Sequence, residues 1–218
     1  MAQWSAGIHF TEGVIMETEF KFSLSDPSIF DSIAKNAEIN KIGLEAVEVI
    51  DMHADYFDTE DEDLHKRGIA YRIRQEDDRC TATIKWDVNV SEGLHQREEF
   101  NLVVNDERFA EHPDIELFLS SDAYDVLKEA AGDKTLVRTI TMDYQRRQLK
   151  VDTGKSISCI SIDEGVIHHA DGHNVPVCEL EIEWYYGDEN DFIELANKIQ
   201  SAYGLETENR SKLQRAFI

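Results

Sequence analysis

The segment VIMETEFKFSL, residues 14–24, alternates between apolar and ionised side chains. In a β-strand, successive side chains point to opposite faces. One face of this segment is then mostly apolar and carries Met16, Thr18, Phe20, Phe22 and Leu24. The other face is charged and carries Glu17, Glu19 and Lys21. The apolar face requires a core, and the simplest interpretation of the charged face is a half-exposed antiparallel strand.

The same alternation recurs in four further segments that read as strands. Their charged faces carry Glu179, Glu181 and Glu183 in VCELEIEW, Arg72 and Arg74 in AYRIR, Lys85 in TATIKW, and Arg97 and Glu99 in HQREEF. Each segment alone fits a solvated face. Together, charged faces of both signs favour a closed barrel whose ionised faces line a wet interior while the apolar faces turn outward under helices.

An interior lined with charges of both signs is suited to bind a charged ligand together with a metal ion. Buried charges need partners, and a polyanion with a divalent metal supplies partners for both signs at once. Carboxylates hold hard cations, whereas Arg and Lys bind phosphoryl oxygens. The pattern therefore predicts a site for a phosphorylated ligand and a metal.

Composition limits the other possibilities. Acidic residues outnumber basic ones 45 to 22, giving a formal charge of −23 that repels nucleic acid and anionic membranes. We therefore expect a small-molecule ligand and neither nucleic acid nor a membrane as partner; oligomeric state is left open. The 218 residues suffice for one domain, expected over residues 14–218 after a tail at 1–13. Cys80, Cys159 and Cys178 match no zinc spacing and are expected to be reduced thiols in a cytoplasmic protein.

The chain as a whole predicts an α+β fold built on an antiparallel sheet. About eight strands and three helices are expected, with the helices over residues 25–37, 120–132 and 188–204. The histidine-rich stretch HHADGHN, which contains His168, His169 and His173, is interpreted as a hairpin turn rather than a metal site. Trp86 and Trp184 fall on apolar faces and are expected to pack in the core.

The ordered motifs resemble the CYTH domain, the triphosphate tunnel metalloenzyme superfamily. The resemblance begins with the Glu-x-Glu-x-Lys signature in ETEFK and continues through YFDT, GIAYRIR, TIKW, GLHQREEFN, SIDEGVI, VCELEIEW and RSKLQRAF. It spans roughly Met16 to Phe217 and is closest to the bacterial CYTH inorganic triphosphatases, many of which carry a helical CHAD domain that would have to begin beyond the end of this sequence. It implies a closed eight-stranded antiparallel β-barrel with a charged interior and helices packed outside.

The resemblance also implies roles for individual residues. The implied metal ligands are Glu17, Glu19, Glu179 and Glu181. The implied substrate-binding residues are Lys21, Arg72, Arg74, Lys85, Arg97, Arg146, Lys212 and Arg215, and the first four are also the expected catalytic groups. Secondary candidates are Glu99, Asp163, Glu183 and Arg138. In LVRTITMDYQRRQ, Arg146 fits the family pattern best, but Arg138 and Arg147 compete because a slip of one residue reverses which side chain points inward.

The implied activity is hydrolysis of a triphosphate with Mg²⁺ or Mn²⁺, most simply inorganic tripolyphosphate to phosphate and pyrophosphate. Two alternatives within the superfamily are a thiamine or nucleoside triphosphatase and a class IV adenylyl cyclase. A third alternative is a polyphosphate-binding module without catalysis. The presence of all four implied metal-side glutamates favours an enzyme, since charge stabilisation without a metal does not activate water.

Overall fold

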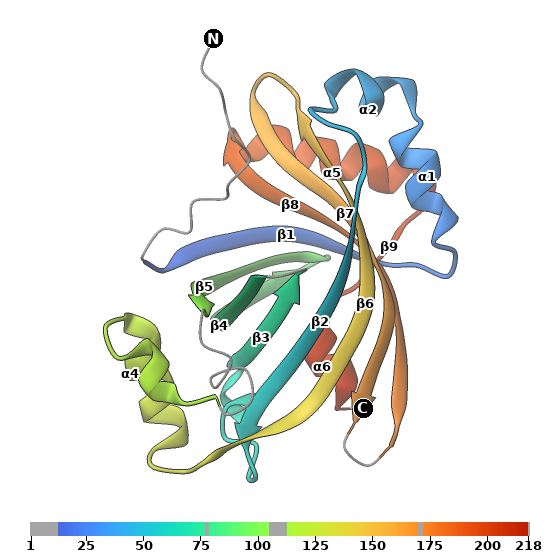
Figure 1. The fold of residues 1–218 in the computed structure, drawn as a ribbon. Coiled ribbons are helices and arrows are strands. Elements are labelled where there is room, and N and C mark those ends of the chain that lie inside the picture. The colour runs from blue at the N-terminus through green and yellow to red at the C-terminus, as the bar shows by residue number, and fades with distance from the viewer. Residues whose placement is uncertain (1–12, 77–78, 105–112, 170–171, 218) are drawn as a thin grey trace.

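Eight antiparallel strands close into a barrel. The computed structural model of the chain describes residues 13–76, 79–104, 113–169 and 172–217. Its strands follow the order β5-β4-β3-β2-β6-β7-β8-β1, and β1 pairs with β5 to close the ring (Figure 1). The predicted fold is confirmed, and the predicted tail at residues 1–13 lies almost wholly outside the described residues.

The strands agree in number and order with those expected. They are β1 (Ile15–Ser23), β2 (Glu48–Thr59), β3 (Ala70–Glu76), β4 (Arg79–Ser91), β5 (Leu94–Val104), β6 (Leu136–Asp152), β7 (Ser156–His169) and β8 (Asn174–Gly187), with a two-residue β9 (Glu206–Thr207) beside β1. The helices are α1 (Ser28–Ala34), α2 (Ala37–Ile42), α4 (Asp122–Ala131), α5 (Glu189–Tyr203) and α6 (Lys212–Ala216), with 3-10 turns at His65–Arg67 and Ile115–Phe118.

One prediction about helices was wrong in detail. Residues 25–37 do not form one helix, because the Asn36 side chain accepts the backbone N–H groups of Glu38 and Ile39 and begins a second helix, α2. At the start of α4, Ser121 makes no side-chain cap; its hydroxyl donates instead to the carbonyl of Phe118, at 2.8 Å.

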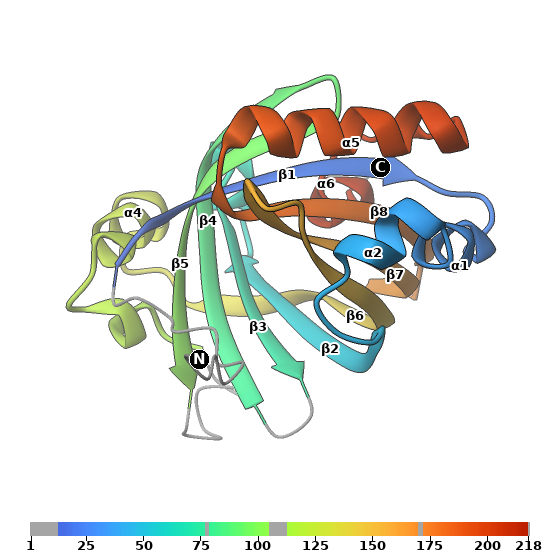
Figure 2. The same ribbon diagram turned by 90° about the horizontal axis from the view of Figure 1, so that it is seen from above.

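The outer face of the barrel is apolar where helices cover it. Under α5, Phe22, Ile160 and Leu180 pack with residues of the helix and with α1 and α2 (Figure 2). Under α4, a second cluster includes Tyr71, whose ring centroid lies 5.3 Å from that of Phe118. The apolar halves of the alternating strands therefore form two cores outside the barrel, as predicted.

The inner face has a charged part and an apolar part. The apolar part contains Met52, Met142 and Tyr144, and α6 packs its Ala216 against them. Helix α6 thus lies against inward-facing residues of the barrel, unlike the helices on the outer face. This arrangement brings the start of α6, at Lys212, to the charged part of the interior.

Gly165 on β7 shows how closely neighbouring strands approach one another. A Cβ atom at this position would lie 2.2 Å from the carbonyl oxygen of Asp143 and 2.4 Å from Cβ of Tyr144. No flexible side chain could move to make room, because the first of these atoms belongs to the backbone of β6.

We therefore predict that Gly165→Ala lowers the free energy of unfolding by about 1–3 kcal/mol or more, measured by urea denaturation. Gly13→Ala is the matched control, since a Cβ there meets nothing within 4 Å. Equal stability of the two variants would contradict the close approach of β6 and β7.

None of the helices in the described part of the chain combines the length and apolar character needed to cross a membrane. The three cysteines, all of which lie in the described ranges, form no disulfide. Burial raises the pKa of the Cys159 thiol to about 11, so it is not a reactive thiolate at neutral pH.

Candidate functional site

The charged part of the barrel interior lines a cavity of about 540 Å³. Side chains from β1, β2, β3, β4, β5, β6, β8 and α6 converge on it. Those predicted from the sequence that line it are Glu17, Glu19, Lys21, Arg72, Arg74, Lys85, Arg97, Glu99, Arg146, Glu181, Glu183 and Lys212. The structure therefore gathers most of the predicted site residues around one space.

Strand register explains this convergence. On either side of β1, Lys21 lies opposite Glu181 of β8, and Glu17 lies opposite Arg97 of β5. Because all these residues occupy inward positions, each basic side chain reaches an acidic one on the neighbouring strand. Burial of both signs is thus made tolerable by pairing.

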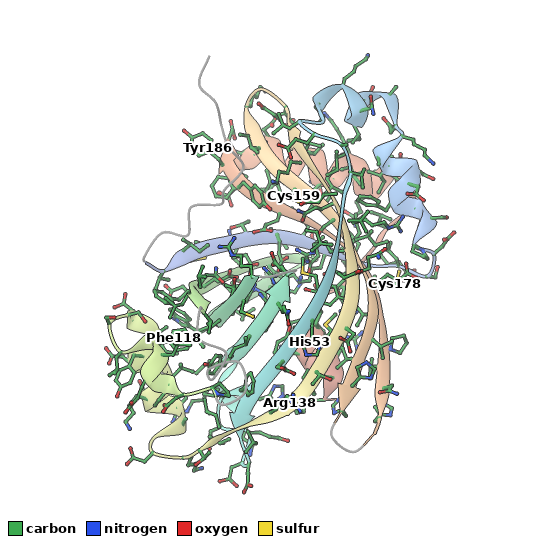
Figure 3. All side chains as sticks on the ribbon, in the orientation of Figure 1. His53, Phe118, Arg138, Cys159, Cys178 and Tyr186 are labelled. Atoms are coloured by element: carbon green, nitrogen blue, oxygen red, sulfur yellow. The ribbon has the colours of Figure 1, made fainter. Side chains whose placement is uncertain are left out.

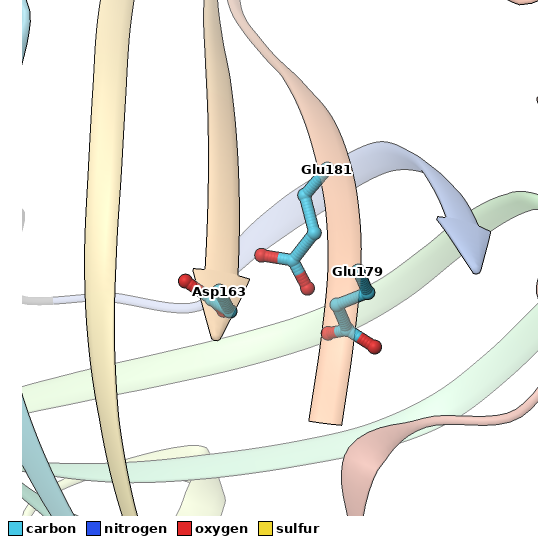
Figure 4. Close-up of side chains that lie close together, drawn as sticks. All are labelled: Asp163, Glu179 and Glu181. Atoms are coloured by element: carbon cyan, nitrogen blue, oxygen red, sulfur yellow. The ribbon is translucent and has the colours of Figure 1, made fainter. Parts of the chain in front are cut away.

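Three carboxylates form a compact cluster at one end of the charged region. Asp163 on β7 and Glu179 and Glu181 on β8 each offer an oxygen atom such that all three lie within 4.8 Å of one another (Figure 4). Side chains of the first two are fully buried and that of Glu181 is 8% exposed. Oxygen-only donors this close suit a hard divalent cation, whose ligands lie about 2.0–2.6 Å from the ion. The residues present therefore fit the metal that the family resemblance implies.

Four basic side chains surround this carboxylate cluster. Arg146 forks onto Asp163 with two hydrogen bonds of 2.7 Å and also reaches Glu181, at 2.7 Å. The other three cations are Lys21, which pairs with Glu181, Arg215, which pairs with Glu179, and Lys212, which pairs with all three carboxylates. The carboxylate cluster is thus neutralised by the protein itself.

The electrostatics follow from this pairing. Burial alone would lower the pKa of Lys212, yet the pKa is raised well above its ordinary value because Asp163, Glu179 and Glu181 favour the ammonium. Burial opposes ionisation of Glu181 as well, but Lys21, Lys212 and Arg146 outweigh it and hold its pKa well below the usual range. Both groups are therefore charged at neutral pH.

A second group of charges lies along β1, β4 and β5. Lys85 Nζ lies 2.7 Å from Glu17 and 2.5 Å from Glu99, and Arg97 Nε lies 2.8 Å from Glu17. Arg97 also pairs with Glu19. Burial opposes ionisation of Glu99, but Lys85 and other cations lower its pKa to about 2. Glu17 and Glu19, predicted as metal ligands, are in this structure engaged with these cations and are not members of the carboxylate cluster.

Two residues of the cavity, Arg72 and Glu183, form no salt bridge with a described residue, although Glu99 and Glu17 lie near enough to favour the charge of Arg72. No described carboxylate forms an ion pair with Arg72, and its buried Nε atom has no hydrogen-bond partner. Burial together with Glu17, Glu19 and Glu99 raises the pKa of Glu183 to about 8, against a smaller opposing effect of Lys85. A guanidinium and a carboxyl that form no salt bridge thus face the same space.

The remaining predicted residues divide between the site and the exterior. Arg74 lines the cavity and pairs with Glu76. Arg138, which is labelled in Figure 3, is 61% exposed and faces Asp55 outside the barrel. Arg147 binds Asp31 of α1, so Arg146 alone of these three points inward. The secondary candidate Arg138 is therefore not part of the cavity.

Two tyrosines of the cavity were not predicted from the sequence, and Asp163 was predicted only as a secondary candidate. Tyr56 and Tyr144 line the cavity, and Lys212 Nζ lies 6.0 Å from the ring centroid of Tyr144. Both occupy inward positions within quoted motifs, so strand alternation could have found them. Asp163, only a secondary candidate, stands inside the carboxylate cluster because β7 brings it between Arg146 and Glu179.

The chain belongs to the CYTH domain family, whose model matches residues 16–217. Among curated proteins it is similar to an inorganic triphosphatase from Haemophilus influenzae, at 27% identity over 163 residues. That alignment covers 75% of this chain but only 44% of the relative, so the chain spans less than half the length of the relative it matches.

Solved structures confirm the fold. A putative adenylyl cyclase from Hippeastrum, described as having a dominant triphosphatase activity, superposes with a TM-score of 0.68 at 20% identity, covering 92% of this chain and 96% of that one. A putative adenylate cyclase from Bacillus halodurans superposes with a TM-score of 0.64 at 21% identity, covering 94% of this chain and 100% of that one.

The raised pKa of Glu183 generates a prediction about stability. Its pKa in the folded state, about 8, lies above the ordinary value of 4.5, so protonation favours the folded state. The contribution is fully present below the ordinary pKa and is lost as the pH rises toward 8. We predict that Glu183→Gln melts at a higher temperature than the unsubstituted protein at pH 8 and above, without metal, and that the difference nearly vanishes at pH 4–5.

The measurement is thermal denaturation followed by circular dichroism across this pH range. Glu189→Gln, at the exposed start of α5, is the control for removal of one acidic charge. A difference in melting temperature that does not change with pH would contradict the crowding of carboxylates around Glu183.

Proposed function

We propose that this protein is a metal-dependent triphosphatase that hydrolyses inorganic tripolyphosphate in the barrel interior. The observation that carries the proposal is the cavity itself, where a strongly acidic chain concentrates Arg and Lys side chains on one inner surface. A small polyanion is the ligand that such a surface attracts despite the net charge of −23.

Phosphate binding is assigned to the cations that line the cavity. Arg72 is the first of these, because its guanidinium forms no salt bridge that an entering anion would have to break. Lys85 and Arg97 stand beside it on β4 and β5, with carboxylates that hold them in the cavity. Arg74, Arg146, Lys21 and Lys212 also line the cavity, and together with Arg215 they complete the proposed set of substrate-binding residues. These cations neutralise charge on the transferred phosphoryl group and on the leaving pyrophosphate.

Metal binding is assigned to the carboxylates on the same interior. Asp163, Glu179 and Glu181 have the closest mutual approach and are the primary ligands proposed. Glu17 and Glu19 remain predicted ligands from β1. When bound, a divalent ion supplies charge neutralisation for phosphoryl oxygens and lowers the pKa of water that it holds. Mg²⁺ and Mn²⁺ are the proposed ions, since both accept carboxylate oxygens.

The reaction needs no covalent intermediate with the protein. In-line attack of water on a terminal phosphorus breaks one anhydride bond and releases phosphate and pyrophosphate. The described cavity presents acids and bases but no serine or cysteine paired with a basic group that would act as a nucleophile. The protein's part is to orient the triphosphate and stabilise its charge.

The first test is release of phosphate by the purified protein from tripolyphosphate or ATP, with Mg²⁺ or Mn²⁺ and with EDTA. We expect metal-dependent release from tripolyphosphate and much slower release from ATP. Tight tripolyphosphate binding without release of phosphate would instead support a polyphosphate-binding module that does not catalyse hydrolysis. Conversion of ATP to pyrophosphate and a cyclic nucleotide would replace the triphosphatase with a cyclase.

The second test concerns Arg72. We predict that Arg72→Met weakens tripolyphosphate binding by roughly tenfold to hundredfold, the value of one or more charge-assisted hydrogen bonds, measured by calorimetry with Ca²⁺ in place of a catalytic metal. Arg67→Met is the matched control, because Arg67 is 49% exposed and pairs with Glu129 outside the cavity. Equal affinities of the two variants would remove Arg72 from the binding site.

A further inference from the structure

Lys212 occupies the position that a cation bound by the carboxylate cluster would take. Its ammonium lies 2.8 Å from Asp163 Oδ2 and 2.8 Å from Glu181 Oε1, and it also contacts Glu179. The Lys212 side chain is only 10% exposed. One side chain therefore holds together three carboxylates that would otherwise repel one another.

The other cations of this cluster are held differently. Arg146 projects from a long strand and forks onto Asp163, and Lys21 projects from β1 and is shared between Glu19 and Glu181. Lys212 is the first residue of α6, a helix of five residues, and its four-carbon stem carries a single mobile charge. Arg215, the fourth cation, also lies on α6 but pairs with Glu179 alone. Lys212 is the one of the four that pairs with all three carboxylates, so its ammonium is the group that a metal bound among them would displace.

The cavity offers a second position for the Lys212 ammonium. It lines the same cavity as Arg72 and Lys85, and its ammonium lies 6.0 Å from the ring centroid of Tyr144, whose π-face accepts a cation. A short rotation away from the carboxylates would keep the ammonium within the cavity. The side chain would then meet a ligand placed against Arg72.

We propose that Lys212 is an internal competitor of the divalent metal. In the absence of metal, its ammonium neutralises Asp163, Glu179 and Glu181 and keeps the empty site from being a cluster of unpaired negative charges. Metal binding expels the ammonium into the cavity, where it becomes available to a phosphoryl oxygen. This second step rests on the proposed function, whereas the competition does not.

The competition predicts that removing the ammonium strengthens metal binding. Lys212→Met should bind Mn²⁺ more tightly than the unsubstituted protein by roughly tenfold to hundredfold, measured without any triphosphate by electron paramagnetic resonance of free Mn²⁺. The control is Lys128→Met, which removes the same charge from the surface, where Lys128 is 42% exposed and pairs with Asp133. Its affinity for Mn²⁺ should change much less.

Unchanged or weaker Mn²⁺ binding by Lys212→Met would overturn the proposal. Equal tightening in Lys128→Met would also overturn it, because the effect would then come from the net charge and not from the carboxylate cluster. Circular dichroism of each variant establishes that it is folded before affinities are compared.

A second measurement uses the unsubstituted protein and so does not depend on a variant folding. Acylation of Lys212 by an amine-reactive reagent, quantified by mass spectrometry, should increase when Mn²⁺ is added without triphosphate. Lys128, which is on the surface and 42% exposed, supplies the internal reference. Unchanged labelling of Lys212 at saturating Mn²⁺ would contradict its expulsion. Because neither measurement involves hydrolysis, competition and catalysis can fail separately.

Discussion

Charges that leave bulk water need partners of opposite sign, and the inner surface of this barrel supplies them from adjacent strands. Lys21 lies opposite Glu181, and Arg97 lies opposite Glu17, because antiparallel register brings those inward positions together. The apolar halves of the same strands form the outer cores under α4 and α5. One pattern of alternation therefore determines both how the protein is held together and where its ligand site lies.

The pairing is uneven along the interior. Around Asp163, Glu179 and Glu181, cations of the protein neutralise the carboxylates, and Lys212 sits among all three. Glu183 lies among Glu17, Glu19 and Glu99 and forms no salt bridge, and Arg72 forms none either. Without ligands, internal ion pairs stabilise the barrel. A metal and a polyanion can replace these internal partners, the metal at the carboxylates and the polyanion at the Arg and Lys side chains. The same groups thus serve folding and binding.

Alternation in the sequence was enough to predict the barrel and most residues that face its cavity. Once one inward residue of a strand is known, every second residue of that strand is placed on the inner face. Alternation alone could not predict which residues of neighbouring strands lie opposite one another. Arg146 was separable from Arg138 and Arg147 only once β6 had its register against β2 and β7, including the irregularity near Tyr56. Asp163 gained its importance from two strand pairings at once. Helix α6 was missed as an element, although Ser211 and Gln214 form the capping box that marks a helix start.

The most direct test of the account is a crystal structure with tripolyphosphate and Mn²⁺, in which anomalous scattering locates the metal independently of the protein atoms. The account predicts an anomalous peak against Glu179 and Glu181, a triphosphate that contacts Arg72, and a Lys212 ammonium that has left the carboxylates. A triphosphate bound outside the barrel, or an anomalous peak away from every carboxylate of the cavity, would contradict it.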